Sequence, residues 1–349
     1  MTRRGWAYFV AVGVVWGLPY LLIRVSVREI SPPLLVFIRT GGASLVLVPL
    51  AAARGALVPA IRRWRAVLLY TLAELAVPWV FLFNAERHLP SSLSGLLVAA
   101  VPLVAAVVAA LTDSDRVDLR RMAGIVVGIA GVGVLVGFSV AGSQLLSLLS
   151  MLVVVIGYAL GPWVVDHRLR GVPPIGVIAW SVLLCAIGYA PWAMLDLPSK
   201  PLSGSVVESA IALTVVCTII AFLLFFALIS EVGAMRATLV TYVNPAVAVV
   251  LGVTVLGEPF GPATAIGFVL ILGGCYLASR PPRRPSGRPA PPARPALRAL
   301  PARAAGRART ATPPGADVPA GADARAAGSG TAEPASGRGD GGPGAVPAP

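Results

Sequence analysis

The chain has 349 residues, of which 57% are hydrophobic and only 12% are charged, and its mean hydropathy is +0.84. These values exclude an ordinary water-soluble domain. The formal net charge of +13 does not indicate a nucleic-acid partner, because about half of the excess lies after position 279, where eleven Arg residues outweigh four acidic ones.

Ten apolar runs predict an all-α integral membrane protein with ten transmembrane helices. A run of roughly 20 residues in a helix crosses a hydrocarbon core of about 30 Å. The first run, after Arg3 and Arg4, is interpreted as a retained helix and not as a cleaved signal peptide, because nine further runs follow. In chain order the predicted helices cover 6–25, 33–53, 66–86, 92–111, 119–138, 145–165, 173–195, 206–229, 235–256 and 261–279.

Residues 281–349 differ in composition from everything before them. They are rich in Pro, Ala, Gly and Arg, and they show no periodicity and no aromatic residue. Such a segment cannot bury enough apolar surface to fold, so a disordered cytoplasmic tail is predicted. The alternative is that its arginines contact anionic lipid headgroups.

Basic residues are distributed unevenly between alternate loops. With the N-terminus inside, fifteen Lys and Arg residues lie in the cytoplasmic loops and ends, against four on the outer side, Arg24, Arg28, Arg87 and Lys200. Basic residues near helix ends are retained on the cytoplasmic side. The bias therefore predicts a multi-pass protein of the cell membrane whose N- and C-termini are both cytoplasmic.

The sequence contains an internal repeat. Residues 87–135 align without a gap to residues 230–278, so that Pro102 meets Pro245 and Gly124 meets Gly267. A copy of five helices crosses the membrane an odd number of times, so the second copy must have the opposite orientation. We therefore predict two inverted five-helix repeats, 1–138 and 139–280, followed by the tail.

These residues carry a family resemblance. The segment from Leu239 to Ala278 resembles the C-terminal part of an EamA-type repeat of the drug/metabolite transporter superfamily, and 90–136 resembles it more loosely. Trp16-Gly17 and Arg39 stand where that family often has such residues, whereas Asp113-Ser114-Asp115 replaces its common Gly-Glu. The resemblance implies a transporter of small metabolites or drugs, often an exporter, working by alternating access around a central cavity between the repeats.

Other functional classes lack their sequence patterns. The chain has no Gly-x-x-x-x-Gly-Lys-Ser/Thr loop to bind ATP, which favours a secondary transporter. It has no HExxH pattern and no Ser/His arrangement within the spans, so a transporter is expected and not an enzyme. The competing functional classes are an intramembrane enzyme and a passive channel or lipid-handling membrane protein. Three Cys and two His residues indicate no metal site, and no cofactor is expected.

Arg39 and Glu74 are the first candidates for a binding site, because ionisable groups within spans usually face a cavity or a partner. Glu74 is predicted to bind the coupling proton or cation, with a structural carboxylate as the alternative. Arg39 is expected either to bind an anionic group of the substrate or to extend toward the outer headgroups. Direct pairing of the two is left open.

Aromatic and amide side chains form a second set of candidates, because a cavity for organic metabolites needs apolar surface with a few polar groups. Trp16 and Tyr158 lie deep in corresponding helices, and Tyr242 and Asn244 precede Pro245, which can break its helix and free backbone carbonyls. Helix packing and interfacial belts are the alternative roles for all such aromatics, which also include Tyr20, Trp79, Trp163 and Trp180.

Three further features are assigned structural roles. Glu86-Arg87-His88 and Asp166-His167-Arg168 are expected at the membrane interface, where polar groups cost little, and Glu258 is expected to cap the tenth helix beside Pro259. Gly124 and Gly128 form a GxxxG pattern that suits either a homodimer or contact between helices of one chain. The expected partners are thus a small-molecule metabolite, the lipid bilayer and a coupling ion.

Overall fold

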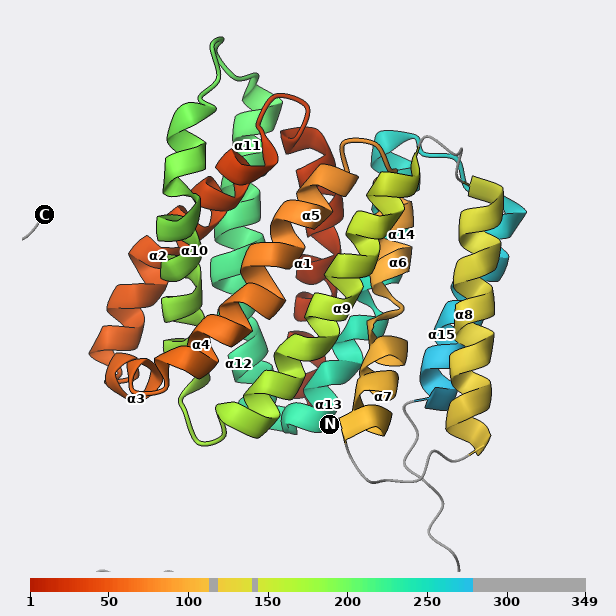
Figure 1. The fold of residues 1–349 in the computed structure, drawn as a ribbon, viewed down its shortest axis with the longest axis horizontal. Helices are drawn as coiled ribbons and strands as arrows, with labels where there is room; N and C mark the ends of the chain where they lie inside the picture. The colour runs from red at the N-terminus through yellow and green to blue at the C-terminus, as the bar shows by residue number, and fades with distance from the viewer. Residues whose placement is uncertain (113–118, 140–143, 279–349) are drawn as a thin grey trace, which may run out of the picture. The chain divides into compact units, whose positions relative to one another are not determined.

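The computed structural model describes residues 1–112, 119–139 and 144–278, all of which lie within one compact unit of the chain, Met1–Pro285. The regular structure of this described part is helical throughout (Figure 1). The predicted tail, 281–349, and the segment 113–115 lie outside the described residues.

The helices follow the predicted order. The first half contains α1 (Arg3–Ser26), α2 (Pro32–Ala53), α3 (Leu57–Ile61), α4 (Trp64–Tyr70), the π-helix η1 (Thr71–Ala76), α5 (Val77–Ala85), α6 (Ser91–Val98), α7 (Val101–Thr112) and α8 (Leu119–Ser139). The second half contains α9 (Leu145–Arg168), α10 (Pro174–Leu195), α11 (Gly204–Thr214), the π-helix η3 (Val215–Ile220), α12 (Ala221–Val232), α13 (Ala234–Ala237), the 3₁₀-helix η4 (Thr238–Tyr242), α14 (Asn244–Leu256) and α15 (Pro262–Ala278).

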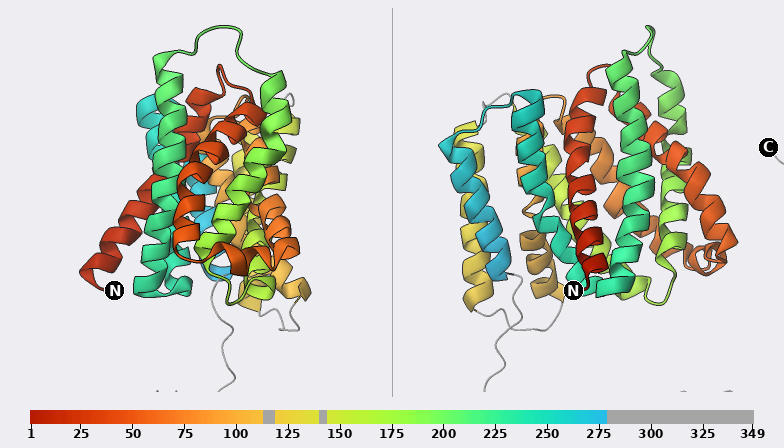
Figure 2. Two further views of the ribbon diagram at one scale, coloured as in Figure 1. Left: turned by 90° about the vertical axis from the view of Figure 1, so that its left-hand side faces the viewer. Right: turned by 180° about the vertical axis from the view of Figure 1, so that it is seen from behind.

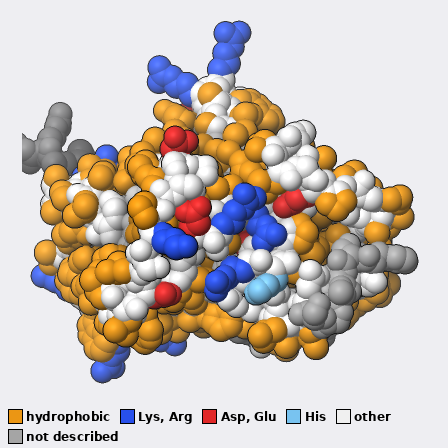
Figure 3. Space-filling model, turned by 90° about the horizontal axis from the view of Figure 1, so that it is seen from above, with side chains coloured by type: hydrophobic (Ala, Val, Ile, Leu, Met, Phe, Trp, Pro, Cys, Tyr) orange, Lys and Arg blue, Asp and Glu red, His pale blue; other side chains and the backbone are white. Residues whose placement is uncertain are grey.

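Within the described residues, nine helical stretches are long and apolar enough to cross a membrane, and each matches one of the predicted spans. The tenth predicted span corresponds to α15, which has 17 described residues and so a length of about 25 Å. Large apolar side chains such as Leu45, Leu111 and Val269 are mostly exposed, as contact with lipid requires. Figure 3 shows the charged side chains of one end face mostly near its centre, with hydrophobic side chains around them.

Several spans contain local departures from α-helical geometry. The π-helices η1 and η3 interrupt the third and eighth spans, and such segments are frequent at functional sites. The fourth span breaks at Ala99 and Ala100, just before Pro102, and the ninth at Val243, just before Pro245. Because proline cannot donate the helical hydrogen bond, these two breaks have the same cause. The predicted break before Pro245 is thus confirmed.

The helices pack in pairs that join the two halves of the chain. In Figures 1 and 2, α8 lies beside α15 at one side of the bundle and α2 beside α10 at the other, and α1 lies between them. Helix α1 packs against α11, α12 and α14, and α9 packs against α5, α6 and α7. The helices of each half are therefore interleaved with those of the other.

The α8–α15 contact depends on glycine. A methyl group at Gly274 would lie 2.5 Å from the backbone nitrogen of Gly128, and one at Gly124 would lie 2.5 Å from that of Ala278. Only hydrogen leaves room for backbones this close. The GxxxG pattern of Gly124 and Gly128 is therefore used within the chain, and a homodimer stays a prediction.

The pair Gly273 and Gly274 gives a test of this contact. Gly274→Ala is expected to destabilise the protein by about 1–3 kcal/mol, because the added methyl group meets backbone atoms that cannot move aside. Gly273→Ala is the matched control, since a Cβ there has no neighbour within 4 Å. Thermal unfolding of the two variants in detergent should show a lower midpoint for Gly274→Ala alone. Equal midpoints would contradict the close approach of α8 and α15.

Candidate functional site

Arg39 lies in the interior of the bundle. Its side chain is only 6% exposed, and its Nε donates a hydrogen bond of 2.8 Å to Thr218 Oγ1 in η3. The guanidinium carbon lies 3.7 Å from the centre of the Trp79 ring, a cation–π contact, and 6.0 Å from the centre of Phe83. The alternative in which Arg39 extends toward the outer headgroups is therefore wrong, because its polar and aromatic partners hold it inside.

Two tyrosines accompany this arginine. Tyr20 of α1 and Tyr158 of α9 both interact electrostatically with the Arg39 guanidinium and with each other. Tyr158 also forms a side-chain hydrogen bond with Trp79 and interacts with Glu74. Tyr158 thus interacts electrostatically with both Arg39 and Glu74.

Glu74 stands in the π-helix η1 and packs against α9. Its Oε2 atom is buried and has no hydrogen-bond partner, and it occupies the space that a Cβ on Gly161 would need. A buried polar atom without a partner is uncommon and calls for an explanation. No ion pair joins Glu74 to Arg39 in the described part of the chain. The carboxyl is therefore positioned by packing and not by a counter-charge.

We call these residues the central cluster: Tyr20, Arg39, Glu74, Trp79, Tyr158 and Thr218. They come from α1, α2, η1, α5, α9 and η3, so that both halves of the chain contribute. In the sequence, Tyr20 and Trp79 are two of several aromatic residues within the spans, and nothing distinguishes them as site residues. Thr218 shows no sequence pattern that predicts a role in binding. A signal exists in hindsight, because Thr218 holds the same place in η3 that Glu74 holds in η1, 144 residues earlier.

Trp16 lies outside this cluster. Its ring makes an edge contact with Phe222, with centroids 6.2 Å apart, and a tilted contact with Phe225 at 4.6 Å. It borders a small apolar core formed by Val12 and Leu228 with neighbouring residues. Trp16 therefore packs α1 against α12 in this structure.

Tyr242 and Asn244 lie at the broken ninth span. The Tyr242 hydroxyl is 3.5 Å from the Cys275 carbonyl oxygen in α15. The Asn244 amide nitrogen, oriented to satisfy its neighbours, donates to the Gly13 and Val240 carbonyl oxygens at 3.2 and 3.0 Å. At the equivalent break in the fourth span, the Cys275 thiol donates to the Ala99 carbonyl. At the break in the fourth span, a side chain of the chain itself thus occupies the Ala99 carbonyl. At the ninth, the Val240 carbonyl accepts from both Asn244 and the Val243 N–H.

Glu86 is more deeply buried than the sequence suggested. Its neighbours Arg87 and His88 are exposed, as expected at an interface, but Glu86 is 0% exposed and both carboxylate oxygens lack a hydrogen-bond partner. Burial raises the pKa of Glu86 well above its ordinary value, Arg24 lowers it and Glu258 raises it further. Glu86 directly follows the end of α5, where the third helix was expected to emerge, so its interfacial position stays a prediction. Its complete burial among neighbouring side chains was not expected.

Glu258 caps a different helix from the one predicted. Helix α15 begins only at Pro262, and the Glu258 carboxylate instead accepts hydrogen bonds from the backbone N–H groups of Ser91 and Ser92, at 2.6 and 2.9 Å. A carboxylate suits the positive end of a helix dipole. The expected cap on the tenth helix is wrong because the N-terminus of α6 lies beside the end of α14. The sequence pattern does not predict this contact between distant segments. Glu258 thus joins the second half of the chain to the first.

The other ionisable and sulfur-containing groups do not assemble into a metal centre in the described residues. No set of three or more His, Cys, Asp or Glu side chains there could hold a metal ion. Cys185, Cys217 and Cys275 are buried free thiols. The chemistry of the central cluster is that of a buried cation, a carboxyl and aromatic surface.

Comparison with known proteins gives the family. The profile of the EamA-like transporter family matches the chain twice, over residues 3–137 and again over 145–280. A chain in a solved crystal structure has the same fold, with a TM-score of 0.58 and 22% identity, over 80% of this chain and 97% of that one.

Two curated relatives are transporters by name. The uncharacterized inner membrane transporter YedA of Escherichia coli K12 is 30% identical over 258 residues, which cover 71% of this chain and 81% of YedA. A probable amino-acid metabolite efflux pump of Salmonella typhimurium is 25% identical over 292 residues, covering 79% of this chain and 95% of the pump. The names of these relatives indicate transporters and not enzymes. The chain is therefore a member of the EamA-like transporter family and a multi-pass membrane transporter.

Proposed function

We propose that the chain is a secondary transporter that exports a small organic metabolite by alternating access around the central cluster. The observation that carries this proposal is the burial, within one bundle, of a cation, Arg39, and of a carboxyl oxygen on Glu74 that has no hydrogen-bond partner. Such groups inside a membrane mark substrate and ion pathways. The named efflux pump among the relatives supports the outward direction.

Arg39 is proposed to bind an anionic group of the substrate. A guanidinium carries five N–H donors, and the bond from Nε to Thr218 uses one of them. Trp79 and Phe83 offer apolar surface beside it, which suits an organic acid better than an inorganic ion. A carboxylate-bearing metabolite of amino-acid size agrees with the name of the efflux-pump relative.

Glu74 is proposed to bind the coupling proton or cation. Its Oε2 atom is buried without a hydrogen-bond partner, and no counter-charge in the described residues pairs with it. A carboxyl of this kind within a span is a candidate for binding a transported or coupling ion. Tyr158 interacts electrostatically with both Glu74 and Arg39. A change of charge at Glu74 is therefore proposed to alter the electrostatic environment of Arg39, where the substrate would bind.

The two halves are proposed to be inverted five-helix repeats, 1–138 and 139–280, with ten spans in all. The double match of the family profile supports this division. The π-helices of the third and eighth spans lie 144 residues apart, and the breaks before Pro102 and Pro245 lie 143 apart. Proline also interrupts α1 at Pro19 and α9 at Pro162. Shared irregularities of this kind are a stronger sign of duplication than shared hydropathy.

The contacts between halves at the outer end are proposed to form the closed outer gate. The contact between the halves is that of Glu258, in the second half, with the N-terminus of α6 in the first. Beside it, within the first half, the Arg24 guanidinium donates to the Glu86 backbone carbonyl and joins the end of α1 to the loop after α5. Alternating access requires that contacts at one end break while those at the other form. These bonds are few, exposed in part and reversible, as a gate requires.

The first test concerns Glu74. Metabolite profiling of cells with and without the protein identifies the substrate, and proteoliposomes then measure its transport against a pH gradient. Wild type is expected to respond to the gradient, whereas Glu74→Gln is expected to lose that response, because an amide cannot exchange a proton. Glu208→Gln, at an exposed position in α11, is the matched control and should behave as wild type. A Glu74→Gln variant that keeps the response of the wild type over a range of pH would exclude coupling through this carboxyl.

The second test moves the Glu74 carboxyl without removing it. In Gly161→Ala the new Cβ would overlap Glu74 Oε2 and lie 2.8 Å from Cδ, so the carboxyl must shift. Transport is expected to fall at least tenfold, about 1.4 kcal/mol of barrier, with the fold retained. Gly188→Ala in α10 adds the same methyl group where nothing lies within 4 Å, and should leave transport unchanged. Equal rates in both variants would show that the position of Glu74 is unimportant.

The third test addresses orientation. The chain is proposed to lie in the cell membrane with both termini in the cytoplasm, supported by the fifteen-to-four charge bias and by the inner membrane transporter among its relatives. Reporter tags fused separately to the two termini should both be protected from a protease added outside intact cells. Opposite protection of the two tags would rule out ten spans, since only an even number returns the chain to its starting side.

A further inference from the structure

A basic pocket lies where α4 begins, at the end of the bundle opposite Glu86 and Glu258. Its volume is about 250 Å³, and its lining consists of Arg62, Arg63, Trp64, Arg65, Ala66 and Arg168. The guanidinium groups come from two stretches distant in sequence, the α3–α4 connection with the first turn of α4, and the C-terminal end of α9. Arg63 Nη1 donates to the Arg168 carbonyl at 2.9 Å, which fixes the two elements to each other.

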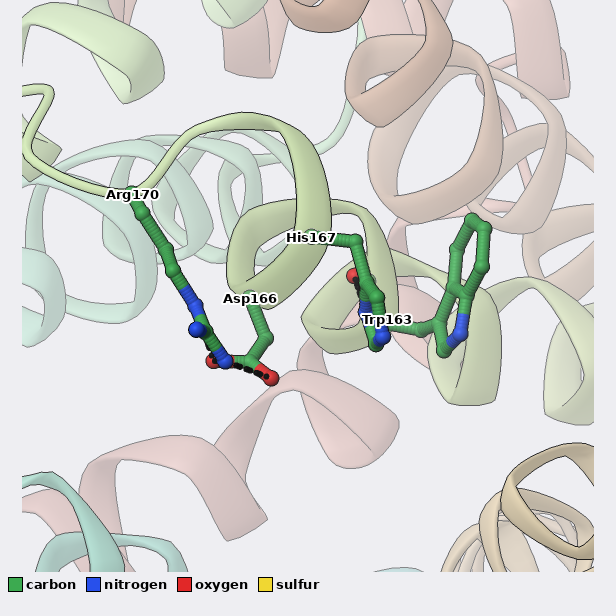
Figure 4. Close-up of polar contacts among 4 residues, drawn as sticks. All are labelled: Trp163, Asp166, His167 and Arg170. Carbon is green, nitrogen blue, oxygen red and sulfur yellow. Dashed lines mark hydrogen bonds and ion pairs between the residues drawn. The ribbon is translucent and has the colours of Figure 1, made fainter. Parts of the chain in front are cut away.

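The nearest acidic residue on these elements does not neutralise the pocket. Asp166 is held by Arg170, whose Nε and Nη2 donate to its carboxylate at 2.8 to 3.1 Å (Figure 4). His167 Nδ1 lies 2.9 Å from the Trp163 carbonyl oxygen, and its ring stacks on the Trp163 indole. Asp166 and His167 therefore interact with residues close to them in sequence and not with the pocket. The pocket lining contains four arginines and no carboxylate.

Exposed apolar side chains lie in the short helix that precedes the pocket and at the start of α4. Val58 and Ile61 of α3 and Trp64 are 56%, 40% and 52% exposed, and Arg65 lies over the Trp64 ring at 5.4 Å from its centre. A short helix with exposed apolar residues and a tryptophan beside arginines is typical of the level where headgroups meet acyl chains. An anion seated here would have its polar part on the arginines and an apolar part against α3.

We propose that this pocket binds the phosphate of an anionic phospholipid headgroup in the leaflet at that end of the bundle. Basic pockets between helix ends recognise such headgroups, and guanidinium groups match phosphate oxygens with paired N–H donors. Because Arg63 also bonds to Arg168, a bound headgroup stabilises the contact between the α3–α4 connection and α9, the helix that carries Tyr158. In the proposed orientation this is the cytoplasmic leaflet.

The test measures lipid binding to the full chain in neutral detergent by native mass spectrometry, with phosphatidylglycerol, cardiolipin and phosphatidylcholine as separate probes. The wild type should retain the two anionic lipids and not phosphatidylcholine. Arg62→Gln with Arg65→Gln removes two charges and leaves the Arg63–Arg168 bond intact. This double variant should bind the anionic lipids roughly thirtyfold more weakly, since each basic residue near a membrane surface contributes about a factor of five.

The control is Arg28→Gln with Arg87→Gln, which removes two exposed arginines from the opposite end and should leave binding unchanged. A further measurement adds inorganic phosphate as a competitor of the anionic lipids. At millimolar concentration it should displace them only weakly, because it lacks the acyl chains that α3 would contact. Equal losses in both double variants, or equal retention of phosphatidylcholine, would overturn the proposed site. Phosphate that binds as tightly as the lipids would overturn the lipid as its ligand.

Discussion

The hydrogen bond from Arg39 to Thr218 is the contact on which the central cluster depends. It joins residues 179 positions apart, one in α2 and one in η3, and it is buried. A guanidinium inside a membrane is costly unless polar and aromatic groups surround it. Here one hydroxyl, the Trp79 ring and two nearby phenols take that role. Because these partners come from both halves of the chain, the buried Arg39 charge stabilises the contact between the halves. A motion that separates the two halves must therefore provide Arg39 with new partners.

The proposed duplication gives this site an instructive asymmetry. Glu74 and Thr218 occupy equivalent places in η1 and η3, yet one is a carboxyl without a partner and the other is a hydroxyl that accepts from Arg39. Thr71 of η1 bonds to Ser181 of α10 at 2.9 Å, a second buried contact between a π-helix and a helix of the other half. Arg39 and Glu74 both belong to the first half, so under the proposed duplication the first half supplies both candidate charges. The second half supplies the neutral hydroxyl of Thr218 that accepts from Arg39.

Hydropathy predicted the spans well, because a helix that crosses a membrane is specified by its own composition over about 20 residues. The breaks before Pro102 and Pro245 were predictable for the same local reason. Side-chain partners were not, because they depend on the rotation and depth of each helix against another. Glu258 illustrates this limit: its neighbour Pro259 suggested a cap on the next helix, whereas its partners Ser91 and Ser92 lie 167 and 166 residues away. Glu86 shows the same limit, since its position in a short loop gave no sign of complete burial.

Tyr158 explains why the two candidate charges need not touch. A direct Arg39–Glu74 ion pair would fix both side chains and leave neither free for a substrate or an ion. Tyr158 interacts electrostatically with both side chains, so each can influence the other without a direct contact between them. The candidate coupling group and the candidate substrate group thus share one electrostatic neighbour, Tyr158. The proposed coupling of ion binding to substrate binding acts through that neighbour and not through an ion pair.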